Sequence, residues 1–166
     1  SRNMTRDTAQ NGFDGLDAAR KAQLGLDKPL SPGLASALSD ELYDGHCQMV
    51  AREKLAPMAR IQRLRDAFMA DGMLTAKGEK AVLIAGNGHV RADRGVPWYL
   101  RRRAPDSGVA VVMPVELNEN GAAPADYVQT GPDGAPLADF IWLTPRAERP
   151  DPCEQMRQMM QQRSGG

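Results

Sequence analysis

A glycine-rich turn that carries a histidine follows one of the apolar runs of the chain. Residues 80–85 read Lys-Ala-Val-Leu-Ile-Ala, and the chain continues as Gly86-Asn87-Gly88-His89. Such a short, unbroken run predicts a strand buried on both faces of a parallel sheet. Ligands of parallel α/β sheets bind beyond the carboxyl ends of the strands, and glycines at 86 and 88 allow positive φ and a close approach to the backbone. We therefore expect His89 to point into a crevice at this edge of the sheet.

The spacing of these glycines does not match the common catalytic and phosphate-binding motifs. A dinucleotide fingerprint needs a third glycine where Arg91 stands, and the Gly-Lys-Ser/Thr of a P-loop is missing. The Gly-x-Ser-x-Gly of a serine nucleophile elbow is also missing. The two histidines, His46 and His89, are far apart in sequence, so a shared metal site would need the fold to bring them and carboxylates together. Nucleotide binding and serine hydrolysis are disfavoured.

The residues after His89 are rich in arginine and contain two aromatic side chains. They are Arg91, Arg94, Trp98, Tyr99, Arg101, Arg102 and Arg103. Arginine binds carboxylates through two parallel hydrogen bonds, and a tyrosine or histidine can ligate haem iron. Such a set suits a planar ligand with acidic arms, such as haem. It is equally compatible with an ordinary solvated helix face beside one structural histidine.

Two helices are predicted before the glycine-rich turn. Ser31 suits an N-cap, a proline follows it, and Gly45 ends the apolar repeat, so residues 31–45 form the first. Residues 57–72 form the second, with one apolar stripe made by Met58, Ile61, Leu64 and Phe68. Arg65 falls beside that stripe. It either extends its charged end to water or projects into a ligand cavity beneath the helix.

Further strands and a helix complete an α/β pattern. Residues 109–115 and 140–143 are apolar runs that predict two more strands, and 96–105 predict a short helix with Pro97 in its first turn. Strand, helix and strand at this spacing indicate a mostly parallel sheet flanked by helices. Residues 118–138 are rich in Gly, Pro, Asn and Asp and predict a long loop. We expect residues 156–166 to form a polar tail with a short, fraying helix.

Bulk composition excludes several classes of protein. The 166 residues and 42% apolar content suit one domain with a real core. Lys plus Arg and Asp plus Glu both number 21, so no overall field attracts nucleic acid or an anionic membrane. No apolar run approaches the length of a membrane-spanning helix. The two cysteines, Cys47 and Cys153, are either free thiols of a cytosolic protein or one disulfide of an exported one.

Several stretches together resemble the ChaN-like haem-binding lipoproteins, which belong to a superfamily with Tiki, TraB and erythromycin-esterase-like proteins. They read IQRLRDAFMADGM at 61–73, VLIAGNGHVRADRGVPWYL at 82–100 and TPRAERPDPC at 144–153. SRNMTR at 1–6 and GHCQM at 45–49 are similar to the family as well. The resemblance covers residues 1–155. The family domain begins with a strand ending in Gly-Glu-x-His, which this chain lacks, so the chain resembles the C-terminal two-thirds of that domain.

The resemblance implies haem binding in bacterial iron uptake, without catalysis. It implies a homodimer in which a tyrosine ligates iron and a histidine assists from the other subunit. His89 matches the glycine-histidine turn, and either Tyr99 or His89 is expected to ligate iron, with Tyr43 and Tyr127 as alternative tyrosines. Arg91, Gly86 and Gly88 would surround the ligand, and Arg65 could meet a propionate. The expectation is that a Soret band on hemin titration weakens in His89→Ala or Tyr99→Phe.

The resemblance also implies export to the cell envelope, with membrane contact only through a lipid anchor outside this chain and no role for nucleic acid. An exported location favours the disulfide, so we expect the Cα atoms of Cys47 and Cys153 within about 7 Å. Closing a loop of about 100 residues would add up to about 4–5 kcal/mol in the chain-entropy model.

Two rival hypotheses remain. A hydrolase of the wider superfamily would use metal, or His89 with a carboxylate as general base. Asp66, Asp93 and Glu116 are the carboxylates that could serve. Zinc or manganese without haem in purified protein would favour this enzyme. The other rival is a structural fragment that binds no ligand.

Overall fold

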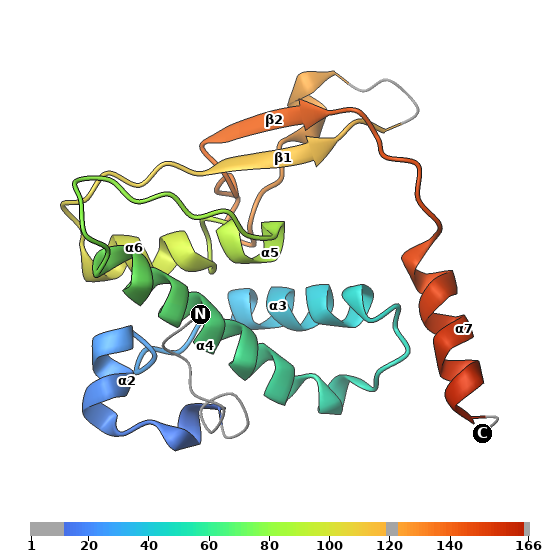
Figure 1. Ribbon diagram of the computed structural model, residues 1–166, viewed down its shortest axis with the longest axis horizontal. Helices are drawn as coiled ribbons and strands as arrows, with labels where there is room; N and C mark the ends of the chain where they lie inside the picture. The colour runs from blue at the N-terminus through green and yellow to red at the C-terminus, as the bar shows by residue number, and fades with distance from the viewer. Residues whose placement is uncertain (1–11, 119–122, 165–166) are drawn as a thin grey trace.

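A layer of helices lies against one side of a small sheet in the computed structural model (Figure 1). The structure describes residues 12–118 and 123–164, so the resemblance at 1–6 lies outside them. In chain order the elements are η1 (Gly12–Gly15), α2 (Ala18–Leu24), α3 (Pro32–Gly45), η2 (Arg52–Lys54), α4 (Ala56–Leu74), α5 (Asn87–Val90), α6 (Val96–Arg103), β1 (Val112–Glu116), η3 (Pro124–Tyr127), β2 (Phe140–Thr144) and α7 (Pro152–Ser164).

The predicted helices are confirmed, because their end signals act as expected. Ser31 Oγ accepts a hydrogen bond from the Leu34 amide at 3.4 Å, and Pro32 is the first residue of α3. α4 covers the predicted 57–72 with one or two residues more at each end. α6 has Pro97 in its first turn. None of the described helices combines the length and apolar character needed to cross a membrane.

The core lies where α4 meets α6, α2 and η1. The predicted stripe on α4 is buried at Leu64 and Phe68, whereas Met58 and Ile61 are half-buried. α6 contributes Val96, Tyr99 and Leu100, which follow one another at i, i+3 and i+4 and therefore share one face. α4 is thus the central helix of the molecule, and side chains that it buries beside this core are removed from water.

The sheet consists of β1 and β2, which run parallel. Val112 lies opposite Phe140, and the register continues to Glu116 opposite Thr144. β2 confirms the predicted strand at 140–143, whereas β1 begins at Val112, three residues later than predicted, and the two strands confirm the α/β class with a parallel sheet. Their outward side chains remain open to solvent, since Phe140 and Trp142 are 63% and 67% exposed.

The predicted strand at 80–85 is wrong. This segment has no strand pairing, and Val82 and Ile84 are 89% and 95% exposed rather than buried on both faces. A β-branched apolar run favours an extended chain, but burial also needs a hydrogen-bonded neighbour and a covering layer. Leu83 packs against the core on one side of the segment, but in the part of the chain that the structure describes no strand pairs with residues 80–85 and no layer covers Val82 and Ile84.

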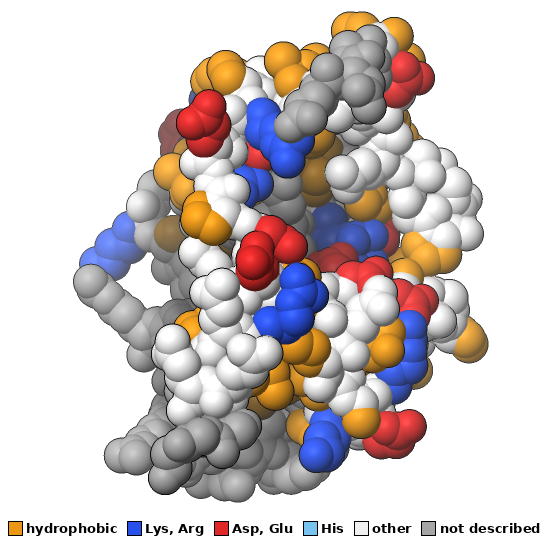
Figure 2. Space-filling model, turned by 90° about the vertical axis from the view of Figure 1, so that its right-hand side faces the viewer, with side chains coloured by type: hydrophobic (Ala, Val, Ile, Leu, Met, Phe, Trp, Pro, Cys, Tyr) orange, Lys and Arg blue, Asp and Glu red, His pale blue; other side chains and the backbone are white. Residues whose placement is uncertain are grey.

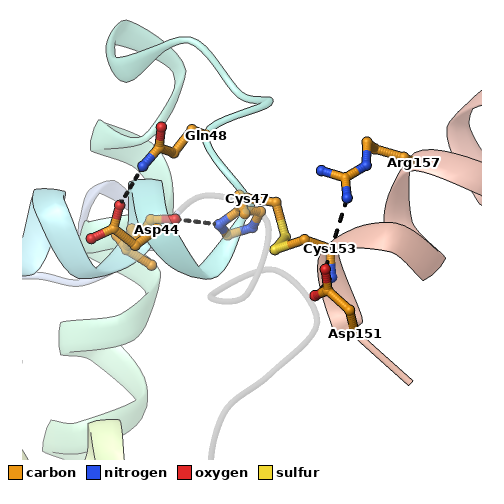
Figure 3. The surroundings of a disulfide bond; sticks show 8 residues. Asp44, Cys47, Gln48, Asp151, Cys153 and Arg157 are labelled. Carbon is orange, nitrogen blue, oxygen red and sulfur yellow. Dashed lines mark hydrogen bonds and ion pairs between the residues drawn. A yellow bond between two sulfur atoms is a disulfide. The ribbon is translucent and has the colours of Figure 1, made fainter. Parts of the chain in front are cut away.

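The predicted disulfide is present between Cys47 and Cys153, whose Cα atoms are 5.4 Å apart. It joins the turn after α3 to the first turn of α7, two segments separated by 106 residues (Figure 3). In Figure 1, α7 stands away from the other helices. α7 also extends from Pro152 into the expected polar tail at 156–166. The bond therefore supplies a covalent attachment for this C-terminal helix.

Candidate ligand-binding site

Charged and polar side chains from three parts of the chain meet where α3 and α4 approach α5. On the face drawn in Figure 2, basic and acidic side chains gather beside a hollow in the middle of the surface. The residues that contact one another are Glu41 on α3, Gln62 and Asp66 on α4, His89 on α5, and Arg91, Asp93 and Arg94 in the segment between α5 and α6.

His89 is oriented from inside the molecule by two side chains of α4. Its Nδ1 lies 2.5 Å from Asp66 Oδ1 and 3.1 Å from Gln62 Nε2. The Asp66 side chain is only 3% exposed, whereas the imidazole is 23% exposed. Within the described ranges, Nε2 has no hydrogen bond. The ring therefore keeps its second nitrogen for another partner, with its orientation set by a buried carboxylate.

Burial dominates the ionisation of Asp66. Loss of hydration raises the pKa of this carboxyl to about 6, although the hydrogen bond and charge of His89 and the charge of Arg94 lower it. The Asp66 carboxyl consequently takes up its proton at a pH much closer to neutral than an ordinary aspartate does. Such a pair can orient the histidine and can also accept or return a proton.

Two arginines and two carboxylates form a second cluster beside this pair. Arg91 donates to Asp93 through Nε at 2.6 Å and Nη2 at 2.8 Å, and through Nη1 to Glu41 Oε2 at 2.5 Å. Arg94 donates to the same Glu41 oxygen and to Asp93. The side chains of Arg94 and Asp93 are 3% exposed, but Glu41 is 41% exposed. Arg94 and Asp93 thus form the buried part of the cluster, and the Glu41 carboxylate forms its solvent-exposed part.

Close backbone approach, rather than positive φ, explains two glycines here. Gly86 has φ −65°, and neither it nor Gly88 is among the described residues with positive φ, contrary to the expectation from sequence. A Cβ on Gly88 would lie 2.9 Å from Glu41 Oε1, and one on Gly95 would collide with the carbonyl oxygens of His89 and Arg91. Gly88 and Gly95 therefore let the two clusters pack together, whereas a Cβ on Gly86 would face open space.

Two cavities flank α5. The polar one has a volume of about 190 Å³ and is lined by Glu41, Asn87, Gly88, Arg91, Met113, Gln129 and Leu137. An apolar one of about 240 Å³ includes Val90 and lies between residues 81–83 and 109–112. Small-molecule sites usually measure about 300–1,000 Å³. The polar cavity is therefore large enough for one arm of a ligand rather than for all of it.

The predicted tyrosine ligand lies elsewhere. Tyr99 is 0% exposed in the core, and its hydroxyl accepts a hydrogen bond from Arg63 Nε at 3.3 Å. Burial raises the pKa of this phenol, which disfavours the phenolate that binds iron. Tyr127 is also buried, and Tyr43 is half-buried beneath the Arg52 guanidinium. None of the three hydroxyls is joined to His89 by a hydrogen bond in the described structure.

Most of the other charged residues that the sequence suggested for the site lie away from His89. Arg65 is exposed and lines none of the cavities found in the described residues, which agrees with the solvated alternative. Arg101 pairs with Asp139, Arg102 covers Trp98, and Arg103 pairs with Asp71. Of the basic cluster in the sequence, the structure brings Arg91 and Arg94 to His89. Glu116, the last residue of β1, instead pairs with Arg149.

Glu41 and Gln62 are the site residues that sequence reasoning missed. Asp66 was considered only as a base for a hydrolase. One signal was available on α4, because Gln62 and Asp66 are four residues apart and therefore share a face next to the buried stripe. Glu41 gave no local signal, since it lies 50 residues from Arg91. No group of three or more His, Cys, Asp or Glu side chains suited to a metal ion was found in the described residues.

Comparison with known proteins identifies the family. The family described as "Haem-binding uptake, Tiki superfamily, ChaN" matches residues 1–100, which include Glu41, Asp66, His89 and Arg91. No curated protein and no solved structure matches the chain. The match covers 100 of the 166 residues. The chain therefore belongs to the ChaN family of haem-binding uptake proteins in the Tiki superfamily.

Proposed function

We propose that this protein binds haem for iron uptake, with His89 Nε2 as a ligand of the iron. The observation that carries the proposal is the 2.5 Å contact between His89 Nδ1 and the buried Asp66 carboxylate. Metal-ligating histidines commonly donate their other ring N–H to a carboxylate, which sets the tautomer and makes the ligating nitrogen more basic. The family supports haem as the ligand.

The residues around His89 also suit the carboxylates and the apolar ring of haem. Haem would supply an iron centre, and His89 Nε2 would hold it. Arg91 and Arg94 provide donors for a carboxylate, and the apolar cavity beside Val90 offers hydrocarbon surface near the same helix. Asp66 and Gln62 hold the imidazole while its exposed edge faces the ligand. The protein's contribution is thus binding and orientation rather than catalysis.

We further propose that the protein acts in the cell envelope, anchored by lipid in its full-length form and paired as a homodimer. The disulfide supports the location, because such bonds persist mainly in oxidising compartments. Cell fractionation would test the location. Light scattering of the haem-loaded protein would test the dimer, and a monomeric mass at every concentration would contradict it.

Hemin titration monitored at the Soret band tests the ligand assignment. His89→Ala should weaken binding by more than the roughly 10–100-fold that loss of an outer partner costs. His46→Ala is a matched control, because this second histidine is held by the Leu42 carbonyl at 2.7 Å next to the disulfide. Tyr99→Phe tests the tyrosine alternative. The assignment is wrong if His89→Ala and His46→Ala titrate alike.

The same pair supports a second candidate, a hydrolase in which His89 activates water. Such an enzyme needs a carboxylate next to the histidine, and Asp66 occupies that position. Hydrolysis of p-nitrophenyl acetate should then fall together in His89→Ala and Asp66→Asn, but not in His46→Ala. Zinc or manganese in the purified protein without haem would favour this candidate. Equal hydrolysis by all variants would exclude it.

A further inference from the structure

We propose that Arg91 and Arg94 form a binding site for an acidic group of the ligand, and that Glu41 occupies this site until the ligand displaces it. The proposal concerns the same site as the proposed function but does not require iron ligation. A carboxylate is the ligand chemistry that the two guanidinium groups match, and phosphate shares it.

The hydrogen bonds divide the cluster into a permanent part and a replaceable part. Asp93 accepts two hydrogen bonds from Arg91 and one from Arg94, and its side chain is 3% exposed. This leaves Nη1 of Arg91 and Nη2 of Arg94, which both point at Glu41 Oε2. Asp93 neutralises one of the two positive charges, so the pair needs one further anion, and Glu41 is that anion.

Glu41 differs from its partners in exposure. It is 41% exposed, whereas Arg91 and Arg94 are 12% and 3% exposed. When one carboxylate replaces another, the buried arginines keep an anionic partner. The free-energy cost of leaving a buried charge unpaired therefore does not arise. The released Glu41 side chain extends from α3 into water, which it already contacts. Displacement therefore costs far less than breaking a fully buried ion pair.

The polar cavity provides a route to Arg91, whose neighbour Arg94 shares the same Glu41 oxygen. Glu41, Gly88 and Arg91 all line it, so an acidic group entering this cavity meets Arg91 directly. Its volume of about 190 Å³ suits a carboxylate arm. The missing side chain of Gly88 leaves room for Glu41 Oε1, since a Cβ there would lie 2.9 Å from that oxygen.

Competition by Glu41 should lower the affinity of the wild-type protein for acids. We therefore expect Glu41→Gln to bind metal-free protoporphyrin IX about tenfold more tightly than the wild type, measured by porphyrin fluorescence. The dimethyl ester of the same porphyrin should show no such gain, because it lacks the carboxylates. Asp40→Asn is the matched control, since Asp40 is the preceding residue of α3 and pairs with the exposed Arg52. Its affinity should equal that of the wild type.

Inorganic phosphate separates a free anion from a porphyrin arm. In thermal unfolding, phosphate should raise the Tm of Glu41→Gln by more than that of the wild type or Asp40→Asn. If Glu41→Gln strengthens the binding of phosphate but not of protoporphyrin IX, the two arginines bind small anions and not an arm of the porphyrin. The proposed haem binding would then have to be judged separately, by the hemin titration of His89→Ala. Equal gains for acid and ester, no gain for any anion, or failure of Glu41→Gln to fold in every buffer would overturn the proposal.

Discussion

Two buried aspartates on α4, five residues apart, have opposite electrostatic surroundings. Asp71 accepts hydrogen bonds from Arg20 at 2.8 Å and Arg103 at 2.6 Å. Burial raises the pKa of its carboxyl, but these two hydrogen bonds and charges outweigh burial and the pKa is lowered. Asp66 instead has the His89 imidazole as its hydrogen-bond partner, and burial raises its pKa to about 6.

The difference separates a structural ion pair from a reactive one. Two permanent cations fix Asp71 as a carboxylate that links α2 and α6 to α4. Asp66 has no such permanent cation as its hydrogen-bond partner, and burial brings the pKa of its carboxyl to about 6. Perturbed carboxyl groups of this kind concentrate at functional sites. The same helix thus uses one aspartate for assembly and the other for the candidate site.

The largest effect on stability is expected from Asp71, near the C-terminal end of α4. Asp71→Ala leaves two guanidinium groups, 29% and 15% exposed, without their shared carboxylate. It should lower the free energy of unfolding by about 3 kcal/mol, measured with urea. Asp40→Ala removes an exposed pair with Arg52 and should cost less than about 1 kcal/mol. Haem binding per folded molecule should not change in Asp71→Ala; equal costs for the two variants would remove the structural role.

The pH dependence of stability should distinguish the two aspartates by sign. The folded pKa of Asp66 is above the unfolded 3.8, so the folded state binds its proton more tightly. The stability of the wild type relative to Asp66→Asn should therefore rise by about 2 kcal/mol as pH falls through the window from about 6 to 3.8. The stability due to Asp71 is lost as pH falls below 3.8. Urea titrations across pH measure both, and a flat difference curve for Asp66→Asn would contradict its raised pKa.

The smallest effect is expected at Gln62. Its amide lies 3.1 Å from His89 Nδ1 and supports the orientation of the ring. His89 Nδ1 donates its one proton to Asp66 and cannot also accept from Gln62, so the amide makes a close contact rather than a hydrogen bond. Gln62→Leu should therefore weaken hemin binding by less than about 10-fold. Arg65→Leu, on the exposed side of the same helix, should leave binding unchanged. Weaker binding in Arg65→Leu would instead support the sequence expectation that Arg65 meets a propionate.

Local sequence signals predicted the helices well. Ser31 with Pro32, and Pro57 with the apolar stripe of α4, act within a few residues of the backbone that they influence. The spacing of Val96, Tyr99 and Leu100 also contained the information that Tyr99 faces the core, but the neighbouring arginines suggested a ligand instead. The prediction of a buried strand at 80–85 is wrong because an apolar run indicates an extended chain but does not determine which neighbouring element packs on it.

The candidate site could be predicted only where its residues are close in sequence. His89 and Arg91 share one turn and were identified from it. Asp66 and Glu41 lie 23 and 50 residues from their partners, and the chain contains 21 acidic and 21 basic residues that could pair in many ways. Family resemblance, rather than spacing, indicated the pairing of Cys47 with Cys153.

By itself, the sequence determined where α3, α4 and α6 begin and end, and that a glycine-rich segment presents a histidine next to arginines. These properties depend on neighbouring residues and on helical periodicity. The tertiary structure alone decided that Asp66 meets an imidazole and Asp71 meets two guanidinium groups. The physical reason is that pairing and desolvation depend on distances across the folded core, and those distances exist only after α3, α4 and α6 have packed.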